Sequence, residues 1–192
     1  MLTESAARWM LVLHTALGVA AVGAATHLVL WMRGYLHGTF TRHRAVRRFA
    51  VISLALHASA MLAGNLMYPT YKVEVRAAYL ENAGAVVNDH AARARELDKL
   101  AAREHAPGFE PPPTADAVKR AAKAARWFDV KEHWIAIGLF ASLALVLVLR
   151  FWDPKRDGRA LAPVVLGLAV VTAGTLWLGA IIGVLTSAAR AV

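Results

Sequence analysis

The sequence predicts an all-α, polytopic membrane protein: a four-transmembrane-helix bundle with a helical extracytoplasmic insertion between helices 2 and 3. Of its 192 residues, 58% are hydrophobic, and the mean hydropathy of +0.44 lies above that of ordinary soluble domains. Four apolar stretches are long enough to cross a bilayer as helices at about 1.5 Å per residue. They are residues 9–31, 49–68, 134–152 and 161–185. Because a helix satisfies its own backbone hydrogen bonds in lipid, we expect one membrane domain over residues 1–192.

Tryptophans mark the ends of two of these stretches. Trp9 and Trp31 bracket the first, and Trp134 and Trp152 bracket the third, as expected for rings that lie at headgroup level. The first stretch is too long for the apolar part of a signal peptide and lacks a basic segment before it, so we interpret it as a mature helix. The fourth contains the small-residue pattern GAIIG, which is typical of a helix that packs closely on its neighbours.

The distribution of charge predicts the orientation. The turn RGYLHGTFTRHRAVRR carries five arginines and no acidic residue, and the turn RFWDPKRDGR is also basic overall. The positive-inside rule places both turns in the cytoplasm. Both termini and residues 69–132 are then extracytoplasmic, in a cell (inner) membrane. The net charge of +9 suits attraction of the basic turns to anionic lipid headgroups. The bilayer is therefore the expected partner, and nucleic acid is not.

The segment 69–132 should be mostly helical. Residues 86–105 are rich in Ala, Glu and Arg without a breaker, and the stretch APGFEPPPT ends this helix. Thr114 is the expected N-cap of a second helix, whereas Pro69 is expected to end the second span, with residues 71–75 extended after it. Neither insertion helix has a broad apolar stripe. We therefore expect them to be solvated or to lie on the membrane domain or a partner subunit.

Some chemistries are excluded by residue content. The chain has no cysteine, which excludes disulfides, covalently attached haem, iron–sulfur clusters with cysteine ligands and thiolate zinc sites. It also has no phosphate-binding glycine loop and no hydrolase motif, so whether it is an enzyme stays open.

Four histidines lie in or against the apolar stretches: His14, His27, His57 and His133. Ionisable residues in lipid are costly and by default indicate function. Helix rise and side-chain direction predict that His27 and His57 reach one depth, and that His14 and His133 reach another. Two imidazoles from different helices in apolar surroundings are what a b-type haem requires, so we expect one or two haems.

The number of spans and the placement of histidines resemble those of the four-helix dihaem cytochrome b subunits that exchange electrons with quinones. This resemblance implies haem b, electron transfer, a quinone and other subunits of a membrane complex. In that family the ligand pairs repeat at fourteen residues on one helix. His14 and His27 are thirteen residues apart and differ by roughly 140° around the helix, so they face different neighbours.

A second cluster is expected at the extracytoplasmic surface. Tyr68, Tyr71, Lys72 and Arg76 should approach the stretch FDVKEHW, in which Asp129 and Glu132 would orient His133 or a neighbouring group. Lys72 and Arg76 are the candidates to pair with haem propionates or to line a quinone site. The alternative is that these residues form an ordinary aromatic belt with interfacial charges.

Two other functions stay open. Met10 shares a helix face with His14, and Met61 shares one with His57, so copper(I) or a proton path is possible. A cofactor-free assembly subunit is the other alternative, in which the buried histidines bond to neighbours such as Thr26, Ser53 and Asn65.

Overall fold

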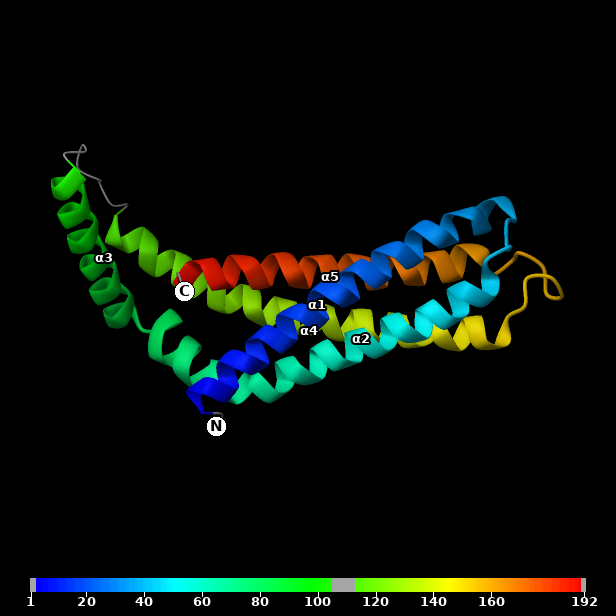
Figure 1. The fold of residues 1–192 in the computed structure, drawn as a ribbon, viewed down its shortest axis with the longest axis horizontal. Coiled ribbons are helices and arrows are strands. Elements are labelled where there is room, and N and C mark those ends of the chain that lie inside the picture. The colour runs from blue at the N-terminus through cyan, green and yellow to red at the C-terminus, as the bar shows by residue number, and fades with distance from the viewer. Residues whose placement is uncertain (1–2, 105–112, 191–192) are drawn as a thin grey trace.

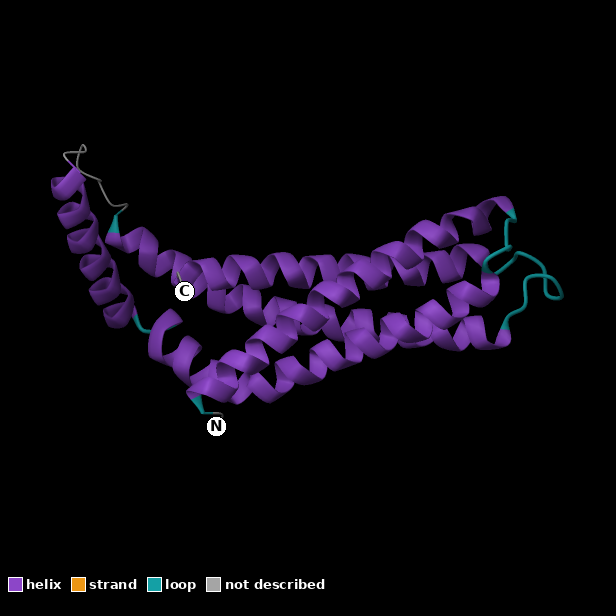
Figure 2. Cartoon of the chain, viewed as in Figure 1, coloured by secondary structure: helices purple, strands orange, loops and turns teal. Residues whose placement is uncertain are grey.

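A computed structural model describes residues 3–104 and 113–190, and within these ranges every regular element is helical (Figures 1 and 2). This confirms the all-α prediction. The elements are α1 (Glu4–Met32), the 3₁₀-helix η1 (Arg33–His37), α2 (His43–Thr70), the π-helix η2 (Tyr71–Leu80), α3 (Ala83–Glu104), α4 (Thr114–Phe151) and α5 (Ala162–Arg190).

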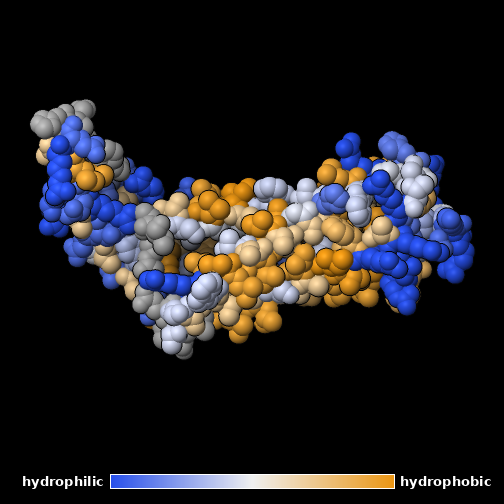
Figure 3. All heavy atoms as spheres, viewed as in Figure 1, coloured by the Kyte–Doolittle hydropathy of each residue, from blue (hydrophilic) through white to orange (hydrophobic). Residues whose placement is uncertain are grey.

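Four helices, α1, α2, α4 and α5, are long and apolar enough to cross a membrane, as the sequence predicted. α1 packs on α2 and α5, and α4 packs on the same two helices, so the four enclose a shared interior. Hydrophobic residues cover the middle of the molecule and hydrophilic residues gather at both ends (Figure 3). The chain therefore has the surface of a multi-pass membrane protein.

The two ends of the molecule differ. We call the end formed by residues 33–48 and 152–161 the basic end, and the opposite end, from which α3 projects, the α3 end (Figure 1). α1 begins and α5 finishes at the α3 end, so the helices next to both termini share an end with the insertion, as the span count requires.

The end of the second span differs from the prediction. Pro69 does not end the helix: α2 continues to Thr70, and residues 71–75 are helical in η2 instead of extended. Proline removes one backbone donor and crowds the carbonyl four residues earlier. Beyond Thr70 the chain stays helical as the wider π-helix η2, in which an N–H donates to the carbonyl five residues earlier. At its end, for example, Glu81 N–H donates to the Arg76 carbonyl at 2.9 Å.

The start of α4 also differs from the prediction. Thr114 is the first residue of α4 and not its N-cap, and α4 runs unbroken for 38 residues into the third span. No Pro or Gly interrupts residues 114–133, so nothing separates a short insertion helix from the span. α3 begins at Ala83, where the Asn82 side chain accepts a hydrogen bond from Ala85 N–H at 3.1 Å. His105, expected at its end, lies outside the described residues.

The insertion builds a small core, which we did not expect from its composition. Its buried residues come from η2, α3 and α4: Leu80, Val86, Ala121, Ala124 and Ala125. Tyr79 adds a hydrogen bond from its hydroxyl to Asp89 at 2.7 Å. The alanines suffice because η2 supplies a third element, and helices that meet through alanine approach closely. Farther along α3, Leu97 and Leu100 are exposed.

The main core lies at the basic end. Its larger buried residues are Leu28, Met32, Tyr35, Val46, Leu145, Leu149, Trp152 and Val165. Tyr35 is hydrogen-bonded to His43 Nδ1 at 2.9 Å and packs edge-on against Phe40 and Trp152. Arg47 donates to the Arg150 carbonyl at 3.3 Å, which ties α2 to the last turn of α4.

Candidate functional site

His57 is enclosed at the contact of α2 with α4 and α5. Its side chain has no exposed surface, and a Cβ atom built on Gly138 would lie 3.1 Å from its Cε1 atom. The same Cβ would clash with the Thr175 side chain, so only glycine fits at position 138 without a shift. The Ile135 carbonyl lies nearby, but no described residue is in hydrogen-bonding geometry with either His57 ring nitrogen or with the buried Ser53 hydroxyl.

His14 enters the same interior from α1. Its Nδ1 atom is hydrogen-bonded to the Ala60 carbonyl of α2 at 2.9 Å, and its Cε1 atom lies 3.1 Å from the Cβ that Gly64 lacks. Ala60 and Gly64 follow His57 by three and seven residues and so share its helix face. His14 is therefore about 5–10 Å from the level of His57, displaced along α2 toward the α3 end.

Lys131 is the third ionisable residue of this interior. It precedes Gly138 by two helical turns on the same face of α4, and its Nζ atom lies 3.3 Å from the Cβ that Gly183 lacks. The ammonium lies 5.6 Å from the Phe128 ring centroid and close enough to His14 for their charges to interact. It forms no ion pair within the described ranges.

We call the group formed by Lys131, His14, His57, Ser53 and Thr175 the polar seam. Glycines on three helices make room for it: Gly64 on α2, Gly138 on α4 and Gly183 on α5. Gly179 receives the Ile135 side chain in the same way, so both glycines of GAIIG face α4, as the small-residue pattern predicted.

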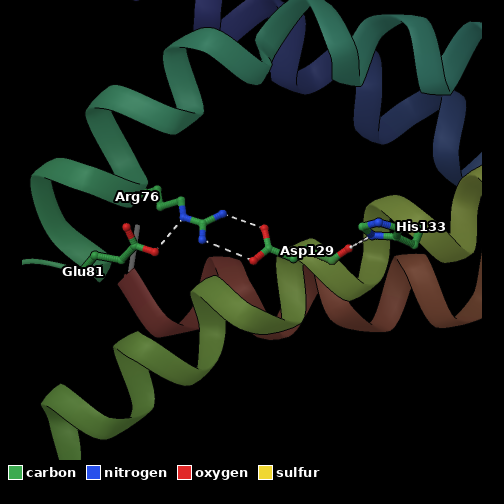
Figure 4. Close-up of polar contacts among 4 residues, drawn as sticks. All are labelled: Arg76, Glu81, Asp129 and His133. Carbon is green, nitrogen blue, oxygen red and sulfur yellow. Dashed lines mark hydrogen bonds and ion pairs between the residues drawn. The ribbon is translucent and has the colours of Figure 1, made fainter.

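A polar cluster lies at the α3 end of α4, near the seam (Figure 4). The Arg76 guanidinium donates to both carboxylate oxygens of Asp129, at 2.6 and 3.2 Å, and to Glu81 at 2.7 Å. Tyr71 stacks on Phe128 with ring centroids 3.9 Å apart, and its hydroxyl is buried without a partner. We call the ion pairs of Arg76 with Asp129 and Glu81 the clasp; its Arg76–Asp129 pair joins η2 to α4.

The clasp confirms that Arg76 approaches the stretch FDVKEHW, and the stacking of Tyr68 and Tyr71 on Phe128 confirms it for these two residues. The partners of Arg76, however, are carboxylates of the chain itself. Lys72 is exposed and forms no ion pair with a described residue.

His133 is exposed beside the clasp (Figure 4). Its Nδ1 atom is hydrogen-bonded to the Asp129 backbone carbonyl at 2.8 Å, so that carbonyl orients the ring while the Asp129 carboxylate binds Arg76. Of the two predicted roles for the Asp129 carboxylate, it therefore takes the second: it orients a neighbouring group, Arg76, and not His133. His133 also follows Lys131 by two residues, which places it about 200° around α4 from the seam.

His27 lies on an exposed face of α1. Its ring packs on Trp31 and Phe49, with centroids 4.6 and 5.7 Å away. The adjacent Thr26 hydroxyl accepts a hydrogen bond from the Trp177 indole at 3.0 Å and donates to the Val22 carbonyl. Two of the predicted histidines, His14 and His57, thus face the interior, and His27 and His133 lie on exposed faces. Whether any of them binds haem stays a prediction.

Sequence reasoning missed Lys131 as an interior residue, because it stands among charges typical of a membrane surface. The detectable signal is its spacing: Lys131, Ile135 and Gly138 fall on one helix face, which the apolar run then continues. No group of three or more His, Asp or Glu residues in the described ranges is placed to hold a metal ion. In comparisons with known proteins, no family model, no curated protein and no solved structure matches this chain.

Proposed function

We propose that this chain is a membrane subunit that moves protons between its α3 end and a buried site at His57. One observation carries the proposal: His57 has no exposed surface, and neither of its ring nitrogens has a hydrogen-bond partner among the described residues. An unpaired imidazole inside a membrane protein is costly, and such residues typically serve as relays or binding sites. Imidazole is also the side chain that gains and loses a proton near neutral pH.

The neighbours of His57 give the path a direction. Toward the α3 end, the interior continues through His14 and Lys131 to the clasp at the surface. In the other direction the Thr172 hydroxyl donates to the Leu168 carbonyl of its own helix, and the apolar core of the basic end follows. The seam is therefore a half-path that ends inside the bilayer. A half-path suits proton delivery to a reaction at that depth, such as quinone chemistry in a larger complex.

Hydrogen–deuterium exchange at the imidazole C2 position, followed by mass spectrometry in lipid nanodiscs, tests this proposal. The exposed His133 serves as the internal reference. We expect His57 to exchange with a rate that titrates with pH, and Lys131→Met to slow that rate several-fold. Lys72→Met removes an exposed charge from the same end and should leave the rate unchanged. Absence of exchange at His57 in the native chain, with normal exchange at His133, would overturn the proposal.

A b-type haem is the second candidate. The favouring observation is that His14 and His133 each bond through Nδ1 to a backbone carbonyl, an arrangement that orients metal-ligating histidines and leaves Nε2 for the iron. The proposed ligands are His14, His27, His57 and His133, with Arg76 and Lys72 near the propionates. In this case the chain would pass electrons to or from quinone or a partner protein.

Absorbance spectra of the purified protein, oxidised and then reduced with dithionite, separate the two candidates. Haem gives a Soret band and a sharp α band, and His57→Leu should remove about half of the haem if two sites exist. A colourless, folded protein from haem-replete cells would end the haem proposal and leave the proton proposal standing. Full haem retention in His57→Leu would place the cofactor elsewhere.

We further propose that the chain is one four-helix membrane domain in an inner membrane, with both termini and residues 69–132 extracytoplasmic. The supporting observation is that Lys and Arg dominate the two short turns of the basic end. Because the chain lacks cysteine, single cysteine substitutions report orientation cleanly. An impermeant maleimide should label Ser5→Cys and Ala106→Cys in intact spheroplasts, and leave Thr41→Cys and Asp157→Cys unlabelled. The reverse pattern would invert this topology.

A further inference from the structure

We infer that a groove on the outer face of α1 and α2, at the basic end, binds the phosphate headgroup of an anionic phospholipid. The groove is lined by one residue of α1 and the first turns of α2: Trp31, Arg44, Ala45, Arg48, Phe49 and Ile52. It lies apart from the polar seam, and the inference does not rest on the proposed function.

The groove concentrates positive charge. Arg44 and Arg48 are one helical turn apart, so both guanidiniums lie on the same side of α2. Both are exposed, and neither forms an ion pair with a described residue. The Arg42 guanidinium lies over the Trp31 ring, 5.8 Å from its centroid, and adds a third charge beside the groove. Guanidinium groups match the geometry of phosphate oxygens.

The backbone adds to this attraction. No side chain caps the N-terminus of α2, because the Arg42 side chain at the cap position has no acceptor atom; of the first-turn N–H groups, that of His43 donates to the Phe40 carbonyl at 3.0 Å. Uncapped N–H groups and the positive end of the helix dipole favour an anion at this place. Arg44 and Arg48 extend from the same first turns, so helix and side chains attract the same ligand.

The remaining wall of the groove is apolar. Trp31 and Phe49 pack with ring centroids 5.1 Å apart, and His27 packs on both. Ile52, one turn deeper, is half exposed and continues the wall toward the hydrophobic band. A ligand that fills the groove therefore has a phosphate at one end and hydrocarbon at the other. A phospholipid has this shape, whereas free phosphate and soluble nucleotides leave the aromatic wall uncovered.

The location fits the same ligand. Trp31 stands where the apolar part of α1 ends, which is headgroup level in a bilayer. Basic pockets between transmembrane helices on the side of the membrane with positive turns are typical sites for anionic lipid headgroups. The exposed His27, which is not part of the polar seam, packs on Trp31 and Phe49 and so belongs to the aromatic wall.

Native mass spectrometry of the detergent-purified protein, incubated with equal amounts of phosphatidylglycerol and phosphatidylcholine, tests the inference. We expect the native chain to retain phosphatidylglycerol preferentially. The double variant Arg44→Gln/Arg48→Gln should bind it roughly 25-fold more weakly, since each arginine near an anionic headgroup contributes about a five-fold gain. Binding of phosphatidylcholine should not change.

Matched controls decide the outcome. Lys155→Gln/Arg159→Gln removes the same charge from the other turn of the basic end and should change phosphatidylglycerol binding less than two-fold. An equal loss of phosphatidylglycerol binding in that control would show that the lipid responds to the overall positive charge of this end, and the proposed site would be wrong. Arg48→Lys keeps the charge and should retain most of the binding, which separates loss of the site from misfolding. If inorganic phosphate alone raises the melting temperature as much as the lipid does, the lipid assignment is wrong.

Discussion

The interiors of the two halves of the helix bundle are built in opposite ways. At the basic end, large side chains such as Leu145, Leu149 and Trp152 interlock with one another. Toward the α3 end, side chains from one helix press against glycines of another, as His14 does on Gly64 and His57 on Gly138. Both arrangements pack the same four helices. The second places ionisable side chains against glycines, whereas at the basic end the ionisable Tyr35 and His43 are hydrogen-bonded to each other among large aromatic side chains.

This difference has a physical cause. In a bilayer the lipid tails are as apolar as leucine, so helices associate through close packing and polar contacts and gain little from hydrophobic burial. Large side chains supply packing at the basic end. Glycine supplies close approach at the α3 end, where an imidazole or an ammonium fills the space that a missing side chain leaves. The same glycines therefore account both for the close contacts between the helices and for the space that the polar seam occupies.

The largest expected effect is that of Gly138→Ala. The added methyl group would overlap Thr175 and lie 3.1 Å from His57 Cε1, so α4 must move away from α5. Overpacking of this kind costs about 1–3 kcal/mol, and we expect the upper part of that range because the Thr175 Cβ atom and the buried His57 ring limit relaxation. The measurement is the free energy of unfolding in mixed detergent–SDS micelles.

Gly174→Ala is the control for this variant. It lies on α5, within the same region, and a methyl group there meets no atom within 4 Å. Its stability should be unchanged or higher by up to about 1 kcal/mol, since alanine favours the helix. Equal effects of both substitutions would mean that the contact at His57 does not hold the two helices together.

Leu149→Ala should have the next largest effect on the free energy of unfolding, and it tests the packing of the basic end. Leu149 is 1% exposed in the basic-end core, and its truncation leaves a cavity among Leu145, Trp152 and Val165. We expect a loss of about 2 kcal/mol, at the low end of the range for core leucines, because transfer to lipid contributes little. Leu147→Ala, on the same helix but half exposed, should cost less than about 0.5 kcal/mol in the same assay. Similar losses from both would contradict a tightly packed basic end.

The contrast between the halves also explains what could be predicted from the sequence. Hydropathy over windows of about 20 residues was sufficient to find α1, α2, α4 and α5, because a lipid-exposed surface must be apolar all along a span. Hydropathy does not show how each helix is rotated about its own axis, and so it does not show which side chains face the interior. By depth the sequence pairs His27 with His57 and His14 with His133. Only the packing of the helices shows that His14 and His57 face the interior and that the other two do not.

Other errors came from local rules that the surrounding structure overrides. Pro69 is a helix breaker by propensity, but α2 continues through it to Thr70 and the π-helix η2 follows directly. Lys131, Glu132 and His133 stand next to each other in the sequence, so all three resemble interfacial anchors. Successive residues of a helix point in different directions, and Lys131 is the one of the three whose side chain lies against Gly183 of α5 in the interior.

The smallest expected effect is that of Asp129→Asn, which breaks the clasp where the polar seam meets the surface. The Arg76 and Asp129 side chains are 22% and 41% exposed, so water screens the pair and limits its contribution. Its two-pronged geometry favours the upper part of the surface range, and we expect a loss of about 0.5–1 kcal/mol in unfolding free energy. The loss should shrink at high salt concentration, because exposed charges are screened.

A double-mutant cycle with Arg76→Gln isolates the pair from the other contacts of each residue. The coupling energy should account for most of the Asp129→Asn effect. Glu81→Gln is the matched control, since Glu81 binds the same guanidinium by one oxygen and is more exposed, at 47%. Its loss should be smaller than that of Asp129→Asn, because it joins η2 to itself and not to α4. A larger loss at Glu81, or no coupling between Arg76 and Asp129, would show that the contact of η2 with α4 depends on the Tyr71–Phe128 stack and not on charge.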